Sequence, residues 1–219
     1  MTAIADEPRW MQARAITESG GWRRGRVVGS DAQKLAVALP DAVVQEIEAA
    51  IVEPAGWTLL VPEDGDRLAR ALEQRGWSVE PAALFTLPDG AHVPDDHGAG
   101  VVPEEERAGT CAHVDAGLRE ELVAARGPLC AIAVDGVAAA FAHAPWRTDK
   151  YFELAADTLP QFRQLGLATH AAALLIRIER QDGRAAVMGA LDVSLAAQRL
   201  ARRLGMVPTI RMHVAWPPD

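Results

Sequence analysis

Residues 159–175 read LPQFRQLGLATHAAALL, and this stretch decides the fold. An extended run ends in it and an amphipathic helix begins in it, with Leu167, Ala171 and Leu174 on one face. Between the two lies an Arg-x-x-Gly-x-Ala turn at residues 163–168. A glycine turn that leads straight into a helix aims unpartnered backbone N–H groups at one point, where the helix dipole is positive. The stretch therefore predicts an anion site that suits a phosphate group.

The segments around this turn alternate between strand and helix patterns. In chain order, the expected elements are a helical segment at 103–126, a hairpin at Asp135-Gly136, strands at 151–158 and 185–191, a helix at 197–204 and a closing strand at 206–216. The hairpin is indicated by two apolar runs that flank a two-residue Asp-Gly turn. The two helices are indicated by apolar residues at helical spacing, each ended by a glycine.

This order of elements resembles the GNAT family of acyl-CoA-dependent N-acetyltransferases. The family's cofactor motif, Gln/Arg-x-x-Gly-x-Gly/Ala, is matched by Arg163, Gln164, Leu165, Gly166, Leu167 and Ala168. The family also often shows Asn-x-x-Ala-x-x-Leu-Tyr-x-x-x-Gly-Phe, where this sequence has Ser194, Ala197, Leu200, Ala201, Gly205 and Met206. The resemblance covers about residues 100–219. It implies an α/β (α+β) fold with a mixed, mostly antiparallel sheet flanked by helices.

The resemblance implies acetyl-CoA as the cofactor. In the family, the pyrophosphate lies at the glycine turn, and the thioester arm binds by backbone hydrogen bonds to a strand that splays from its neighbour. By position, those backbone groups are expected around Ala156 to Leu159. The full set of expected cofactor-binding residues is Thr158, Leu159, Arg163, Gln164, Leu165, Gly166, Leu167, Ala168, Thr169 and Ser194.

Amide formation from a thioester needs a neutral amine, a polarised carbonyl and a proton for the departing thiolate. Tyr151, Glu153 and Asp157 alternate onto one face of the strand at 151–158, and Glu153 is the expected base, directly or through water. Ala201 stands where the family often has the tyrosine that protonates the thiolate. Tyr151, the only tyrosine of the chain, is therefore the candidate acid; another acid, or departure of the thiolate without one, stays open.

The leading prediction is an N-acetyltransferase that moves an acetyl group to the primary amine of a small molecule within a ternary complex. The alternative is a non-catalytic acyl-CoA-binding or protein-interaction module on the same fold, which the missing tyrosine favours. Residues 1–100 hold 16 acidic and nine basic residues, a balance that repels nucleic acid and anionic lipid and attracts an amine. We expect no nucleic-acid partner, no membrane partner and no metal site, and leave a homodimer open.

The first half of the chain is expected to be an extra N-terminal α/β lobe, residues 1–99, joined to a catalytic domain at 100–219. Arg67-Leu-Ala-Arg-Ala-Leu72 before Gly76 echoes Arg199-Leu-Ala-Arg-Arg-Leu204 before Gly205, which indicates either a degenerate half-domain or a chance likeness in an Arg- and Ala-rich chain. The Pro-, Gly- and Asp-rich stretch at 88–100 is the expected loop between them. Only two cysteines occur, without C-x-x-C spacing, which favours a cytoplasmic protein.

Overall fold

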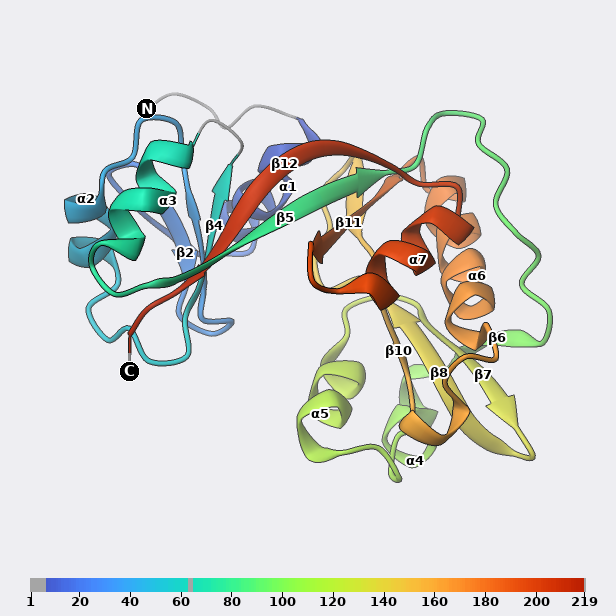
Figure 1. Ribbon diagram of the computed structural model, residues 1–219. Coiled ribbons are helices and arrows are strands. Elements are labelled where there is room, and N and C mark those ends of the chain that lie inside the picture. The colour runs from blue at the N-terminus through green and yellow to red at the C-terminus, as the bar shows by residue number, and fades with distance from the viewer. Residues whose placement is uncertain (1–6, 63–64, 219) are drawn as a thin grey trace. The chain divides into compact units, whose positions relative to one another are not determined.

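The computed structural model describes residues 7–62 and 65–218 (Figure 1). The chain forms two compact units. The N-terminal unit comprises Met1–Phe85, Gly189–Gln198 and Pro208–Asp219, and the central unit comprises Thr86–Met188 and Arg199–Val207. Each unit is therefore formed by segments that are distant from one another in the sequence. The expected boundary between residues 99 and 100 falls inside the central unit, at the first residue of a strand.

The N-terminal unit is a sheet with helices packed on it. Its elements are η1 (Pro8–Trp10), α1 (Met11–Glu18), β1 (Trp22–Arg24), β2 (Val27–Ser30), β3 (Leu35–Ala38), α2 (Val44–Ala50), β4 (Thr58–Pro62), α3 (Asp66–Glu73), β5 (Ser78–Thr86) and most of β12 (Val207–Trp216). The strand order is β1-β2-β3-β4-β12-β5. β3 and β4 are parallel, whereas β2 with β3 and β12 with β4 are antiparallel. Ile47, Leu59 and Leu72 lie in one buried core, because α2 and α3 turn their apolar faces to the strands.

The central unit is built around a second, four-stranded sheet. Its elements are β6 (Ala99–Val102), η3 (Glu104–Glu106), α4 (Arg107–Thr110), α5 (Ala116–Ala124), β7 (Leu129–Val134), β8 (Val137–His143), β9 (Tyr151–Glu153), β10 (Ala155–Thr158), η4 (Pro160–Phe162), α6 (Leu167–Gln181) and the first part of β11 (Ala185–Leu191). The strand order is β10-β8-β7-β6, and all three pairings are antiparallel. α7 (Leu195–Arg203) begins in the N-terminal unit and ends in the central unit.

Helices cover both faces of the four-stranded sheet. Phe141 of β8 is fully buried in a cluster with Cys111 and Leu122, so α4 and α5 cover its face. Ala140 and Ala142 alternate with Phe141 and therefore point to the other face. α6 packs against β7, β8 and β10 (Figure 1). The small alanines allow this long helix to approach the strands closely.

Most of the expected elements of the central unit are confirmed. The hairpin turns at Asp135 and Gly136, whose φ angles of 51° and 80° are those that a tight two-residue turn requires. The prediction of one continuous helical segment at 103–126 is wrong. The segment breaks into η3, α4 and α5, because the chain turns after Cys111 and Asp115 then caps α5 by accepting a 3.1 Å hydrogen bond from the Leu118 N–H. Among the described residues, no helix has the length and apolar character needed to cross a membrane.

Candidate functional site

The strand expected at 151–158 is divided in two at Leu154. β9 pairs in parallel with β11, Tyr151 facing Ala185, whereas β10 pairs with β8 on the four-stranded sheet. Leu154 continues the first pairing by donating its N–H to the Val187 carbonyl at 2.8 Å. The expectation of a single strand is therefore wrong, because its two halves bond to different partners.

This division leaves β10 at the edge of its sheet. Its ladder to β8 runs from Ala155, opposite His143, to Thr158, opposite Ala140. Within the described chain, no strand pairs with its other edge. Backbone N–H and C=O groups on such an edge can bind an extended ligand as a further strand would. The splayed strand expected around Ala156 to Leu159 is thus present, although the N–H of Leu159 already donates to the Ala139 carbonyl at 2.9 Å.

The glycine turn follows β10 after one turn of 3₁₀ helix. Gln164 and Gly166 both have positive φ, 68° and 79°, and α6 begins at Leu167. A Cβ added to Gly166 would meet no atom within 4 Å. Glycine is therefore needed here for its left-handed backbone, and the space in front of the turn is open.

The backbone N–H groups of this turn have few acceptors. Among the described residues, no hydrogen bond is formed by the N–H groups of five consecutive residues, Gln164 to Ala168. The N–H of Thr169 is engaged, because it donates to the Gly166 carbonyl at 2.9 Å. Unpartnered donors at the start of a 15-residue helix are suited to bind an anion. Arg163 is exposed beside them, and its Nε lies 3.3 Å from the Thr158 carbonyl.

The loop at 88–100 is fastened to α6 rather than free. Arg177 reaches Asp96 at 2.7 Å, and Arg180 donates to the Ala91 carbonyl at 3.0 Å. In the first turn of α6, His170 Nδ1 lies 2.7 Å from the Asp95 carbonyl. These contacts hold the helix that carries the turn.

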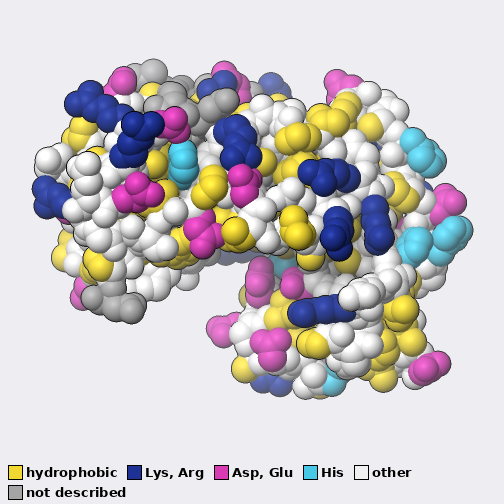
Figure 2. All heavy atoms as spheres, viewed as in Figure 1, with side chains coloured by type: hydrophobic (Ala, Val, Ile, Leu, Met, Phe, Trp, Pro, Cys, Tyr) yellow, Lys and Arg dark blue, Asp and Glu magenta, His cyan; other side chains and the backbone are white. Residues whose placement is uncertain are grey.

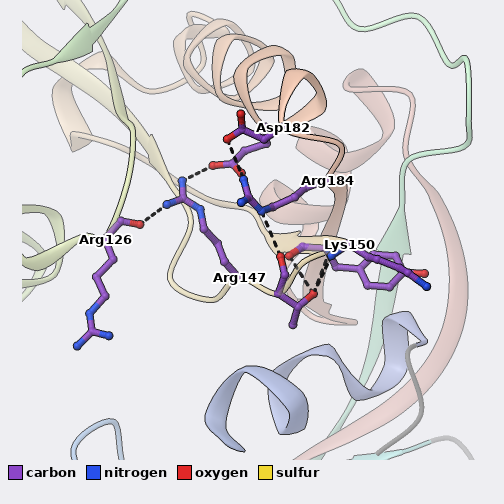
Figure 3. A network of polar contacts seen from close by, with 8 residues as sticks. Arg126, Arg147, Lys150, Asp182 and Arg184 are labelled. Atoms are coloured by element: carbon purple, nitrogen blue, oxygen red, sulfur yellow. Dashed lines mark hydrogen bonds and ion pairs between the residues drawn. The ribbon is translucent and has the colours of Figure 1, made fainter. Parts of the chain in front are cut away.

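The C-terminal end of α6 is closed by a network of ions (Figure 3). Glu179 is 1% exposed and accepts hydrogen bonds from Arg147 and, at 3.0 Å, from Arg184. Arg184 also binds Asp182 at 2.9 Å, and Arg147 donates to the Arg126 carbonyl. The buried carboxylate thus has two cationic partners, as burial of a charge requires.

The two expected catalytic residues lie on β9, near this closed end. Arg184 donates to the Thr148 carbonyl at 3.1 Å, and Thr148 in turn binds the Tyr151 N–H through its Oγ1 at 3.0 Å. Glu153 donates its N–H to the Trp146 carbonyl at 2.9 Å. α6 is about 22 Å long, at about 1.5 Å per residue. Tyr151 is therefore held beside the opposite end of α6 from the glycine turn, and Glu153 lies two residues closer to β10.

Asp157 is brought to a different place from Tyr151 and Glu153. On β10 it lies opposite Phe141, so its side chain is on the face of the sheet that α4 and α5 cover. His143 lies opposite Ala155 and shares that face. The three residues expected on one strand face are therefore divided between two sheets.

His143 and Glu121 form a polar pair on that face which the sequence pattern did not indicate. His143 is 1% exposed, and its Nε2 lies 2.9 Å from Glu121 Oε1 on α5. The hydrogen bond with His143 holds the pKa of Glu121 below its usual range. Burial first, and then the charge of Glu121, raise the pKa of Asp157. The exposed Glu121 carboxylate and the partly buried Asp157 carboxylate thus lie on the same face of this sheet.

Two further expected positions lie elsewhere. Ser194 belongs to the N-terminal unit, where its N–H donates to the Leu191 carbonyl at 2.9 Å. Ala201, in the place of the family's tyrosine, is fully buried. No group of three or more His, Cys, Asp or Glu side chains within residues 7–62 and 65–218 is arranged to hold a metal ion.

No protein-family model and no curated protein sequence matches this chain. Solved structures match over nearly its whole length. A GCN5-related N-acetyltransferase from Kribbella flavida is 22% identical with a TM-score of 0.70, over 99% of this chain and 98% of that one. A GNAT-family protein from Novosphingobium aromaticivorans is 20% identical with a TM-score of 0.68, over 96% of both chains. A tandem GNAT protein from the clavulanic acid biosynthesis pathway is 14% identical with a TM-score of 0.52, over 96% of this chain and 95% of that one.

These likenesses confirm the fold expected from the glycine turn and the elements around it. The chain has the GNAT fold, with a mixed α/β architecture in which most strand pairings are antiparallel.

Proposed function

We propose that this protein transfers an acetyl group from acetyl-CoA to the primary amine of a small molecule, directly within a ternary complex. The observation that carries the proposal is the row of five unpartnered N–H groups, Gln164 to Ala168, at the start of α6 and next to the free edge of β10. Such a row at a helix start can donate hydrogen bonds to an anion, and coenzyme A carries a pyrophosphate.

The described residues fit coenzyme A at this place. The pyrophosphate would accept hydrogen bonds from the turn, where the open space at Gly166 admits it. Arg163 would add a full positive charge near the phosphates. The extended arm would bind the edge of β10, near Ala156 and Thr158. When bound, acetyl-CoA supplies the thioester whose acyl group is transferred.

The chain's own groups would handle the acceptor's proton. Glu153 would take a proton from the amine, directly or through water, so that the neutral nitrogen can form the new C–N bond as the C–S bond breaks. Tyr151 would return a proton to the thiolate. The buried Ala201 offers no proton, so the thiolate either receives one from Tyr151 or another group, or leaves without help.

Direct transfer is favoured over an acyl-cysteine route by the state of the two thiols. Cys111 and Cys130 are buried and free. Burial raises the pKa of Cys130 to about 12, and that of Cys111 is also raised by burial. Neither thiol is a good nucleophile. Free buried thiols also suit the reducing cytoplasm, where we place the protein.

A second function is favoured by one observation. Because Ala201 stands in the place of the family's tyrosine, the chain could bind acyl-CoA and serve as a non-catalytic interaction module. Thiol release from acetyl-CoA, measured across a panel of primary amines, separates the two functions. Turnover with any amine supports transfer, and tight binding without thiol release supports the module.

Gly166→Glu tests the cofactor site itself. It would place an anion where the pyrophosphate is expected, and should weaken acetyl-CoA binding about 10²-fold or more, roughly 3 kcal/mol. Gly183→Glu is the matched control, since Gly183 has the same φ of 79°, equally open space and a place at the other end of α6. The affinity for acetyl-CoA, measured by calorimetry, should fall in Gly166→Glu but not in Gly183→Glu. Equal affinity in two folded variants would remove the site from this turn.

A further inference from the structure

The carboxylate of Asp157 lacks a bonded partner. It makes no hydrogen bond or ion pair with any described residue. The charged groups that act on it are Glu121 and Asp115 from α5 and its cap, His143 from β8, and Arg163 from the segment after η4. Arg163 is the one permanent cation among them, whereas Glu121, Asp115 and Asp157 itself are carboxylates, and His143 is bonded to Glu121. Negative charge therefore exceeds positive charge around Asp157, and a cation would be stabilised there.

A second observation on the same face points to a polar ligand. The His143 side chain is 1% exposed, and its Nδ1 has no hydrogen-bond partner although it is buried. Buried ring nitrogens in proteins almost always have a partner. His143 shares its sheet face with Asp157, and its Nε2 holds Glu121 in place at 2.9 Å. The same face thus carries one carboxylate held in place, Glu121, one carboxylate without a bonded partner, Asp157, and an unsatisfied buried nitrogen.

Acidic side chains also cover the outside of this region. Figure 2 shows acidic residues gathered over α5. This helix and its cap carry three acidic residues, Asp115, Glu120 and Glu121, against one basic residue, Arg119. A local surface of this sign draws cations toward the β10 edge.

We propose that Asp157, flanked by Glu121 and His143, binds the ammonium group of the acceptor amine beside β10. The inference rests on the proposed acetyl transfer and defines the acceptor class as small amines that are cationic near neutral pH. Asp157 would hold the ammonium ion and so determine specificity, and Glu153, four residues away on β9, would take the proton of that same nitrogen through water. The site lies on the strand whose free edge is expected to hold the thioester arm, so an ammonium bound there is close to the acyl group.

Two amines of similar size separate charge recognition from chemistry. Benzylamine is an ammonium ion near neutral pH, and aniline is neutral. Asp157→Asn should lower kcat/KM for benzylamine about 10-fold through KM, and leave the value for aniline and the acetyl-CoA affinity unchanged. Asp135→Asn, at an exposed residue in the β7–β8 turn, is the charge-matched control and should change kcat/KM for neither benzylamine nor aniline. Equal losses for both amines, or no loss for either, would overturn the subsite.

The pH dependence gives a readout that a merely structural role would not change. Asp157 binds an ammonium only when ionised, so kcat/KM for benzylamine should fall as the pH drops through its raised pKa. Glu121→Gln removes a charge that raises this pKa, so the fall should move to lower pH. An unmoved or oppositely shifted profile in a folded variant contradicts the proposal.

The subsite can fail separately from the proposed function. If the wild type binds acetyl-CoA but releases no thiol with these two amines or with any other member of the primary-amine panel, the transferase function is wrong. Calorimetry with benzylamine then decides the subsite alone. About 10-fold weaker binding to Asp157→Asn than to wild type would support it, and equal binding would overturn it.

Discussion

At its C-terminal end, helix α6 has its polar groups satisfied by the protein itself. The Glu179 carboxylate has two arginine partners, the Gly183 N–H donates to the Arg180 carbonyl at 3.0 Å, and the Arg184 N–H donates to the Glu179 carbonyl at 2.9 Å. At the N-terminal end, five successive N–H groups have no acceptor among the described residues.

The backbone itself does not explain this difference. Gly166 and Gly183 flank the same helix with the same φ of 79°. The C-terminal end is hydrogen-bonded within the protein as a stable helix terminus requires, and the N-terminal end keeps donors that are open to solvent or to a ligand. The comparison separates a part of the molecule that serves stability from the part that we propose binds acetyl-CoA.

The largest expected effect comes from removing residues 1–99. This cut takes away Ala91 and Asp96, which hold α6 through Arg180 and Arg177, and also the strands that pair with β12 in the N-terminal unit. The fragment 100–219 should be poorly soluble or unfolded. Circular dichroism melts of the fragment and the full chain provide the measurement. A cooperatively folding, fully active fragment would show that α6 needs neither set of contacts.

The closed end of α6 should be important for stability. Glu179→Ala leaves Arg147 and Arg184 without their buried partner and should lower the free energy of unfolding by about 3–5 kcal/mol. Asp182→Ala, whose side chain is 62% exposed, is the control and should cost under about 1 kcal/mol. Urea unfolding measures both. Similar costs for the two variants would contradict a stabilising role of the buried carboxylate.

The chemistry should depend on β9 without affecting binding at the turn. Glu153→Gln keeps the shape of the side chain but removes its basic site, and should lower turnover about 10²-fold with acyl-CoA affinity intact. Tyr151→Phe tests the proposed acid in the same assay. If both variants keep wild-type turnover with a true acceptor, both catalytic assignments are wrong and the protein only positions an already neutral amine.

The smallest effect is expected at Arg163, beside the N-terminal end of α6. Arg163→Ala removes an exposed charge from a turn whose backbone donors remain, and should weaken acetyl-CoA binding about 10-fold or less. Arg163→Lys keeps the charge and should recover part of the affinity. A loss as large as that of Gly166→Glu would mean that the side chain, rather than the backbone, forms the site.

Local features of this site could be predicted from the sequence. The turn at 163–168 and the helix after it depend on a glycine with positive φ and on apolar spacing, both visible in a short window. The hairpin at Asp135 and Gly136 is local in the same way.

Features that depend on distant partners could not be predicted. The alternation of residues 151–158 is continuous, and only the change of pairing from β11 to β8 divides it at Leu154. The contact of His143 with Glu121 joins a strand to a helix 22 residues away, and the contacts between the 91–96 loop and α6 span 75 to 89 residues. No spacing rule connects such residues. Asp157 could be placed on a strand, but its neighbours could not.

The central claim is that the backbone N–H groups at the N-terminal end of α6 bind coenzyme A and those at its C-terminal end do not. Backbone amide NMR of the full chain, titrated with coenzyme A, tests it most directly. The largest shifts of the amide signals should occur at residues 164–168 and along β10, and residues 182–184 should stay unchanged. If the amides at 182–184 shift as much as those at 164–168, or if the largest shifts lie outside α6 and β10, the open end of α6 is not the acyl-CoA site.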